Sequence, residues 1–111
     1  FRRVLFRSET ISLADIAGRK DVFVLQVTGE SMIDDHICNG DYVMVERTNS
    51  VRDGEIAVAL VGGSENTLKR LYHERDGRIR LQPANSAMAP IMVAAEDVAV
   101  QGRVVGVLRK Y

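Results

Sequence analysis

The sequence predicts one mostly antiparallel all-β domain with strongly bent sheets and one or two short helical turns. Three observations favour this class. Short β-branched and apolar runs are separated at close intervals by turn signals such as Asn39-Gly40-Asp41. No long stretch repeats its apolar residues with the 3.6-residue period of an amphipathic helix. The length of 111 residues is that of a single domain that can bury a core.

The first half of the chain contains three predicted strands. Residues 22–27 are apolar and rich in Val, and the turn residue Gly29 follows them closely. Residues 42–46 follow the turn at Gly40, and residues 55–61 lie between the pairs Asp53-Gly54 and Gly62-Gly63. Each run therefore has the length and boundaries of a short strand.

The second half predicts a hairpin, a loop and a closing segment. Residues 67–73 and 78–82 flank Asp76-Gly77, and the second run alternates cleanly between polar and apolar residues. Pro83 and Pro90 bracket a loop at residues 84–89. Residues 98–108 supply one or two closing strands.

Glycines and two weak helical signals complete the pattern. Gly102 and Gly106 are expected to mark bends or bulges in the closing segment. Residues 13–17 could form one helical turn. Residues 31–36 could form another, with Ser31 at its start.

The first eight residues differ from the rest of the chain. They combine three arginines with apolar residues without a strand or helix pattern, and they look like the translation of a sequencing-library adapter. We expect residues 1–8 to be a non-native leader and residues 9–111 to be the domain. The alternative is an ordinary basic N-terminal arm. On the first interpretation, whatever preceded residue 9 in the native protein is missing.

Composition limits the function and the compartment. Lys plus Arg and Asp plus Glu number 15 each, so this segment lacks the basic excess of a DNA-binding surface. Cys38 is the only cysteine, which excludes an internal disulfide and fits a reducing compartment. No apolar run approaches the roughly 20 residues of a membrane-spanning helix, and no signal peptide is recognisable. We therefore expect a cytoplasmic protein without a membrane anchor.

Ser31 is a candidate nucleophile. Gly29 allows the chain to turn sharply just before it. If a helical turn begins at Ser31, free N–H groups lie beside the hydroxyl, and the amides of Glu30 and Ser31 could form an oxyanion hole. The plainer alternative is that Ser31 is only the N-cap of that turn.

Lys69 is a candidate general base. Strand alternation places Thr67, Lys69 and Leu71 on one face and Arg70 on the other, so one of the two basic side chains points inward. A buried lysine needs a pKa lowered by roughly 3 units to act near neutral pH, about 4 kcal/mol of desolvation. The alternative is that both basic side chains lie on an exposed edge strand.

Other reactive side chains carry weaker signals. One ligand-rich cluster resembles a polar turn more than a metal site, and we expect neither metal nor cofactor binding. His36 is too close to Ser31 in a tight turn to serve as its base, and His73 is expected to be solvated. Cys38 is expected to be a small buried residue, and Met88 and Met92 to pack or to form a binding surface. The cluster consists of Asp34, Asp35, His36, Cys38 and Asp41.

Several ordered motifs together resemble the C-terminal peptidase domain of LexA-type SOS repressors. The resemblance extends over roughly residues 9–111, and the motifs that carry it lie at residues 23–33, 39–42, 67–70, 81–86 and 102–107. The residue before the serine is glutamate here, whereas relatives often have aspartate. Since that position contributes mainly its backbone amide, the difference leaves the resemblance intact.

The resemblance implies a self-cleaving Ser–Lys peptidase with Ser31 as nucleophile, neutral Lys69 as base and the Glu30 and Ser31 amides as oxyanion hole. The family cuts its own chain at a small-residue–glycine bond, commonly Ala-Gly, well upstream of the serine. Ala17-Gly18 is too close to Ser31 and is interpreted as a helix end or turn. The scissile bond and a winged helix-turn-helix domain are therefore expected before residue 9.

The resemblance also implies partners. The RecA–single-stranded-DNA filament would stimulate cleavage, operator DNA would bind only through the missing N-terminal domain, and a homodimer would form through the strand that begins at Gly102 and ends at Leu108. A UmuD-like polymerase accessory subunit and a phage repressor remain alternatives. So does a non-catalytic dimerisation module. A signal-peptidase relative would need a membrane anchor.

Overall fold

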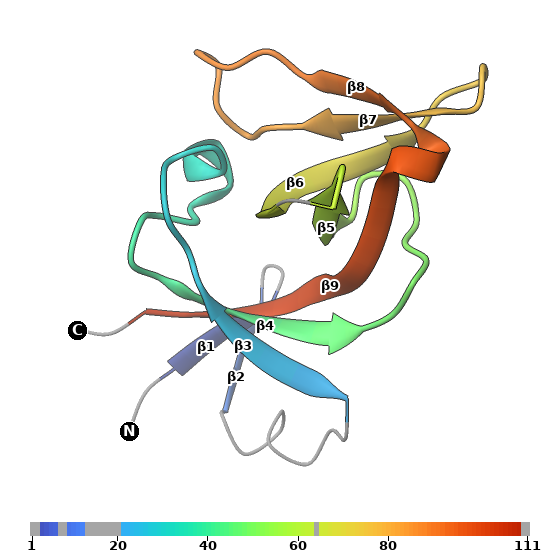
Figure 1. The fold of residues 1–111 in the computed structure, drawn as a ribbon. Helices are drawn as coiled ribbons and strands as arrows, with labels where there is room; N and C mark the ends of the chain where they lie inside the picture. Colours follow the sequence, from blue (N-terminus) through green and yellow to red (C-terminus); the bar gives the residue numbers. More distant parts are fainter. Residues whose placement is uncertain (1–2, 7–8, 13–20, 64, 110–111) are drawn as a thin grey trace.

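The computed structural model describes residues 3–6, 9–12, 21–63 and 65–109, which form one strongly bent antiparallel sheet (Figure 1). Two 3₁₀ helices interrupt it, η1 (Ile33–Asp35) and η2 (Ala95–Asp97). The predicted all-β class is confirmed. The strands are β1 (Arg3–Phe6), β2 (Glu9–Ser12), β3 (Val22–Gln26), β4 (Tyr42–Arg47), β5 (Ile56–Val61), β6 (Glu65–His73), β7 (Arg78–Gln82), β8 (Ile91–Ala94) and β9 (Val98–Leu108).

Strand β9 joins the two halves of the sheet. The strand order is β2-β1-β9-β5-β6-β7-β8, and β4 pairs with β9 and with β3. The first part of β9 pairs with β5, and its second part pairs with β4. Figure 1 shows β9 bending from the β5–β8 half towards the β3–β4 half. The long strand therefore sets the position of one half against the other.

Two bulges bend β9 at the predicted glycines. Val58 and Ala59 face Gly102 and Val100, so one residue of β9 is extra between them. A second register shift follows between Met44 and Val45 of β4, beside Gly106. An extra residue in one strand of a pair increases the local bend and twist. The predicted bends at Gly102 and Gly106 are confirmed.

Gly102 also lies too close to β4 for any side chain. A Cβ atom there would lie 2.5 Å from the carbonyl oxygen of Glu46 and 2.5 Å from Cγ1 of Val45. Val45 is 0% exposed, so its methyl group has no free space to move into. The close approach of β9 to β4 therefore depends on glycine at this position.

Two hydrophobic clusters hold the elements that carry the candidate site. The first contains Met32, the neighbour of Ser31, and the second contains Leu71, which follows Lys69 on the same face of β6. Both side chains are 1% exposed. The buried members are Met32, Ile37, Val43, Val45 and Val58 in the first cluster, and Val51, Ala57, Leu71, Ile79 and Leu81 in the second.

Most predicted elements are confirmed to within two residues. The predicted strands correspond to β3 to β7 and β9, and residues 98–108 form one strand. Strands β6 and β7 form the predicted hairpin, and residues 84–89 form the predicted loop. The helical turn predicted at residues 13–17 lies outside the described residues. In the described parts of the chain, no helix has the length and apolar content to cross a membrane.

Three strands were not predicted. Ile91–Ala94 forms β8 against β7, and β2 covers Glu9–Ser12. The expectation that residues 1–8 contain no strand is wrong, because Arg3–Phe6 forms β1 and pairs with β2 and with the end of β9. Its run Val4-Leu5-Phe6 consists of residues that favour strands. The non-native origin of the octapeptide stays a prediction.

Candidate active site

Ser31 lies in a tight turn between β3 and η1. Gly29 has a φ of +84°, which a side chain would strain, and its N–H donates to Oδ1 of Asn39 at 2.9 Å. Met32 is buried in the first hydrophobic cluster. The sharp turn and the buried methionine thus hold the Ser31 backbone from both sides.

Ser31 is not the start of a helix. The short helix η1 covers Ile33–Asp35, its N-cap is Met32, and no side chain caps it. It ends at His36, which has a φ of +61° and donates its N–H to the carbonyl of Ile33. The short helical turn predicted within residues 31–36 is confirmed as a 3₁₀ helix that begins two residues later than expected. The interpretation of Ser31 as its N-cap is wrong, because Met32 occupies that position.

Lys69 points into the protein from the middle of β6. It is 8% exposed and lies beside the buried Leu71 on the same face of the strand. Strand β6 has β5 on one side and β7 on the other, and Lys69 itself pairs with Ala57. The alternative of an exposed edge strand carrying both basic side chains is wrong.

The fold brings Lys69 and Ser31 together. Nζ of Lys69 lies 3.2 Å from Oγ of Ser31 and 2.7 Å from Oγ1 of Thr67. Burial disfavours the charged amine and lowers the pKa of Lys69 below its usual value of 10.5. Sequence reasoning did not identify Thr67 as a partner of Lys69, although its position two residues earlier on the same strand face was the available signal.

This geometry permits proton transfer. When Lys69 is protonated, it donates to Oγ of Ser31 and to Oγ1 of Thr67. When it is neutral, its lone pair can accept the proton of the Ser31 hydroxyl across the same 3.2 Å. A nucleophile within hydrogen-bond reach of a base is the arrangement that activated serines require.

The peptide unit that precedes Ser31 is held through the carbonyl group of Glu30. The Glu30 oxygen accepts from Nδ2 of Asn85 at 2.8 Å and from the Ile33 N–H at 3.3 Å. Within the described residues, the amides of Glu30 and Ser31 donate no backbone hydrogen bond, and both residues lie at least partly at the surface. Both N–H groups can therefore donate to an oxyanion.

Loop 83–90 clamps the serine turn from one side. Asp34 donates its N–H to the Ala84 carbonyl at 2.7 Å, and its carboxylate accepts the Ser86 N–H at 2.9 Å. Together with Asn85, these bonds attach the loop to the turn that follows Ser31. Sequence reasoning did not identify this contact, because the residues are far apart in the chain.

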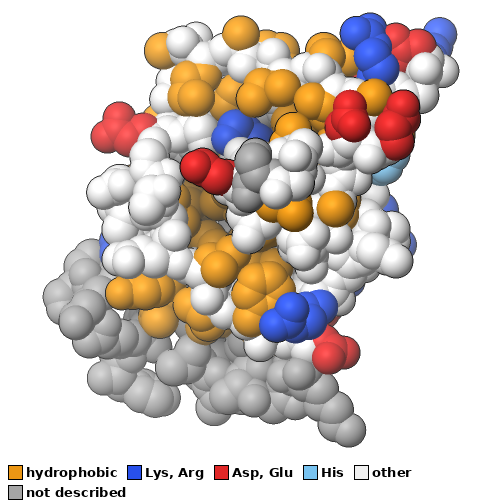
Figure 2. Space-filling view, in the orientation of Figure 1, with side chains coloured by type: hydrophobic (Ala, Val, Ile, Leu, Met, Phe, Trp, Pro, Cys, Tyr) orange, Lys and Arg blue, Asp and Glu red, His pale blue; other side chains and the backbone are white. Residues whose placement is uncertain are grey.

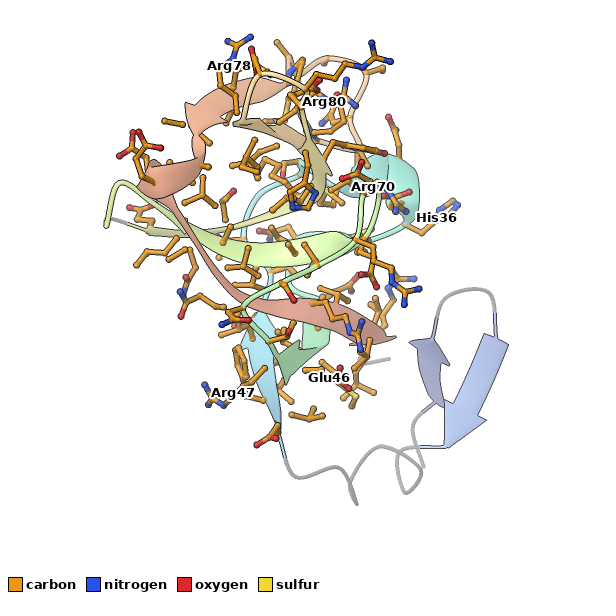
Figure 3. All side chains as sticks on the ribbon, turned by 90° about the vertical axis from the view of Figure 1, so that its right-hand side faces the viewer. His36, Glu46, Arg47, Arg70, Arg78 and Arg80 are labelled. Carbon is orange, nitrogen blue, oxygen red and sulfur yellow. The ribbon has the colours of Figure 1, made fainter. Side chains whose placement is uncertain are left out.

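An ion pair clamps the same turn from β6. Nε of Arg70 lies 2.8 Å from Oδ2 of Asp35, and its Nη1 donates to the Gly54 carbonyl. Figure 3 shows Arg70 beside the turn that bears His36. Since Arg70 follows Lys69 and Asp35 lies close to Ser31 in the chain, this ion pair links the strand that carries the lysine to the turn that carries the serine.

The predicted ligand-rich cluster is used for structural contacts. Asp34 binds loop 83–90, Asp35 binds Arg70, and Asp41 accepts from Arg109 at 2.7 Å and from the Cys38 N–H at 2.8 Å. The Arg109 hydrogen bond lowers the pKa of Asp41. Among the described residues, no group of three or more His, Cys, Asp and Glu side chains is placed to hold a metal.

The remaining candidate residues, all of which the structure describes, make no hydrogen bond to Ser31 or Lys69. His73 is exposed and its ring contacts Asp53 at 2.6 Å. Cys38 is only partly buried. Met88 and Met92 are 44% and 38% exposed, so they belong to the surface and not to the packed core. Figure 2 shows hydrophobic side chains gathered over the end of the molecule formed by β7, β8 and their loop.

A cleft of about 860 Å³ lies beside β9, on the Arg70 side of β6. It is lined by η1, by the residues before β5 and by Val104 to Val107 of β9. Strand β4 occupies one edge of β9, and β5 and β1 pair at the opposite edge, up to Arg103 and from Val107 onwards. The segment predicted to form a dimer is therefore already paired along one whole edge and at both ends of the other.

Comparisons with known proteins identify a family and several relatives. The Peptidase S24-like family matches residues 3–105. A LexA repressor of Koribacter versatilis (strain Ellin345) is 65% identical over 103 residues, 93% of this chain and 49% of that protein. LexA repressors of Novosphingobium aromaticivorans and Clostridium novyi (strain NT) are 48% and 46% identical, over 88% and 91% of this chain and 42% and 48% of theirs. The chain spans about half the length of these curated relatives.

Proposed function

Because the chain belongs to the Peptidase S24-like family, we propose that it is the self-cleaving Ser–Lys peptidase and dimerisation domain of a LexA-like repressor. One observation carries the proposal. The buried amine of Lys69, whose pKa burial lowers, lies 3.2 Å from the hydroxyl of Ser31. Burying a charged amine is costly, which favours a catalytic role for Lys69 over a purely structural one.

The proposed reaction is acyl transfer followed by hydrolysis. Neutral Lys69 takes the proton of Ser31 while Oγ attacks the scissile carbonyl carbon, and the amides of Glu30 and Ser31 bind the resulting oxyanion. The Lys69 ammonium then gives its proton to the leaving amine as the C–N bond breaks. Water, deprotonated by Lys69, releases the acyl group from Ser31.

The names of the relatives support a biological role as a repressor. We propose that the native protein carries a DNA-binding domain and an Ala-Gly scissile bond upstream, and that the RecA filament stimulates self-cleavage in the SOS response to DNA damage. Cleavage would separate the DNA-binding domain from the dimerising domain. Binding to paired operator half-sites would then lose the avidity that dimerisation provides.

The proposed dimer uses the strand from Gly102 to Leu108. Since β4 covers one edge of β9, a twofold mate has to approach the opposite edge, where the pairs with β1 involve only Val107 and Leu108. Val104 to Gly106, which lie between the residues paired with β5 and those paired with β1, line the cleft. Pairing of two β9 strands over the whole of this segment would require β1 to give up its pairs with Val107 and Leu108, and β5 its pairs with Gly102 and Arg103.

Cleavage of a peptide supplied in trans tests the peptidase. The 111-residue chain is incubated at alkaline pH with a peptide that contains an Ala-Gly bond, and the products are identified by mass spectrometry. We expect cleavage that is lost in both Ser31→Ala and Lys69→Ala. Cleavage that survives Lys69→Ala would contradict the base, and a folded chain that binds the peptide without cutting it would support a non-catalytic dimerisation module.

The same chemistry would serve a UmuD-like polymerase subunit or a phage repressor. The native sequence upstream of Glu9 distinguishes these roles. A DNA-binding domain there would support the repressor, whereas a short arm with a Cys-Gly bond would support the polymerase subunit.

A further inference from the structure

Asn85 reaches the serine turn from a distant part of the chain. Its Nδ2 donates to the carbonyl oxygen of Glu30 at 2.8 Å, across a separation of 55 positions in the sequence. Asn85 lies in loop 83–90, which connects β7 to β8. The contact therefore joins this loop to the peptide unit immediately before the candidate nucleophile.

The orientation of the Asn85 side chain is fixed by its own loop. Oδ1 accepts the Ala87 N–H at 2.9 Å, and the Asn85 carbonyl accepts the Met88 N–H at 3.0 Å. Because Oδ1 is engaged as an acceptor, the amide group of the side chain faces Glu30 with its donor. A flipped side chain would place two oxygen atoms against each other and lose both bonds.

Holding the Glu30 carbonyl also fixes the Ser31 N–H. The two groups belong to one planar peptide unit, and in a trans peptide they point in opposite directions. The described residues contain no cis peptide bond. A donor that pins the carbonyl on one side therefore aims the N–H at the other side. It also polarises the peptide unit, which makes the N–H a better donor.

We propose that Asn85 is a positioning residue of the oxyanion hole: it orients the Glu30–Ser31 peptide so that the Ser31 N–H points at the developing oxyanion. The inference rests on the proposed function, since it assigns Asn85 a part in the same acyl transfer. Preorganised donors act strongly because they need no reorientation as charge develops.

The loop does not depend on Asn85 alone for its attachment. The Asp34 N–H to Ala84 bond and the Ser86 N–H to Asp34 bond lie on either side of it and use backbone groups of the loop. Removal of the Asn85 donor should therefore leave the loop in place. This separation allows a test that distinguishes positioning from folding.

Two variants remove the donor in different ways. Asn85→Asp keeps an acceptor for the Ala87 N–H but places an oxygen against the Glu30 carbonyl, and Asn85→Leu is neutral and of similar size. Ser86→Ala is the matched control, because the clamp uses the Ser86 backbone. Rates are compared at the alkaline plateau, where Lys69 is neutral in every variant, so that the charge of the new Asp does not alter the base.

For the peptide in trans, we expect kcat to fall roughly 10- to 100-fold in both donor variants, with KM and thermal midpoint close to those of Ser86→Ala. An unchanged kcat in both variants would overturn the proposal, because the donor would then have no effect on the reaction. A loss of kcat confined to Asn85→Leu would also overturn it, because only that variant removes the acceptor of the Ala87 N–H. A parallel change in KM and thermal midpoint would also overturn it, in favour of a purely structural role.

A second readout does not depend on activity. In NMR spectra of the unliganded chain, loss of the donor should shift the Glu30 carbonyl carbon and the Ser31 amide signals in both variants. If the wild-type chain cleaves nothing while these signals shift, the proposed function fails and the positioning of the peptide stands. If cleavage is normal and the signals do not move, the positioning fails and the peptidase stands.

Discussion

The hydroxyl of Thr67 should set the pH at which the candidate peptidase becomes active. Oγ1 of Thr67 lies 2.7 Å from Nζ of Lys69 and accepts a hydrogen bond from the ammonium. Thr67→Val removes this acceptor and preserves the branched shape of the side chain. The charged form of Lys69 then loses more stabilisation than the neutral form, so its pKa should fall further.

The size of the effect follows from the hydrogen-bond energies. A bond to a charged group contributes about 1.5–3 kcal/mol and a neutral one about 0.5–1.5 kcal/mol, so the two forms of Lys69 differ by about 1 kcal/mol. At 1.36 kcal/mol per unit, the pKa of Lys69 should fall by about 0.7 units. The midpoint of the pH–rate profile should move to lower pH by the same amount.

The assay measures cleavage of the Ala-Gly peptide as a function of pH, with Thr67→Ser as the control that keeps the hydroxyl. We expect Thr67→Ser to keep the wild-type midpoint and Thr67→Val to lower it. A midpoint that stays unchanged or rises in Thr67→Val would refute the reasoning, because it would mean that Thr67 does not favour the charged amine.

Three further expectations concern stability and the clamp. Gly102→Ala forces a methyl group against β4, and the free energy of unfolding in urea should fall by about 1–3 kcal/mol, whereas Gln101→Ala on the same strand should change little. Because the pKa of Lys69 is lowered in the folded state, the unfolded chain binds more protons than the folded chain between that lowered pKa and the ordinary value of about 10.5. The free energy of unfolding should therefore rise with pH across this window. Urea unfolding at a series of pH values should show the rise, and Lys69→Met should abolish it. Arg70→Gln and Asp35→Asn should each lower kcat severalfold, because each removes the ion pair between β6 and the serine turn. A double-mutant cycle in kcat should give a coupling energy of about 0.5–1 kcal/mol for this partly exposed pair, and strictly additive effects would contradict a role for the ion pair in holding the turn.

Much of the fold could be predicted because its strands have clear local boundaries. Two predicted runs contain β-branched residues and form strands: residues 42–46 follow the turn at Gly40, and residues 55–61 lie between Asp53-Gly54 and Gly62-Gly63. Strand β8 was missed because Ile91–Ala94 is short, follows a proline and has two exposed side chains. Such a strand gains most of its order from pairing with β7, which no local pattern reveals.

The site could be predicted only in part. Strand alternation indicated that Lys69 or Arg70 points inward, and the structure selects Lys69. The turn at Ser31 was expected to be a helix start, but Met32 is drawn into the core and the helical residues begin after it. The contact of Asn85 with Glu30 depends on how loop 83–90 packs, and long-range packing leaves no spacing signal in the sequence.

The central claim is that Lys69 activates Ser31, and covalent trapping tests it most directly. A peptide fluorophosphonate transfers its phosphonyl group to an activated serine oxygen with loss of fluoride, and mass spectrometry locates the adduct. The account expects one adduct on Ser31, formed faster as pH rises through the lowered pKa of Lys69, absent in Ser31→Ala and strongly slowed in Lys69→Ala. An adduct on another residue, or labelling of Ser31 at the same rate without Lys69, would contradict it.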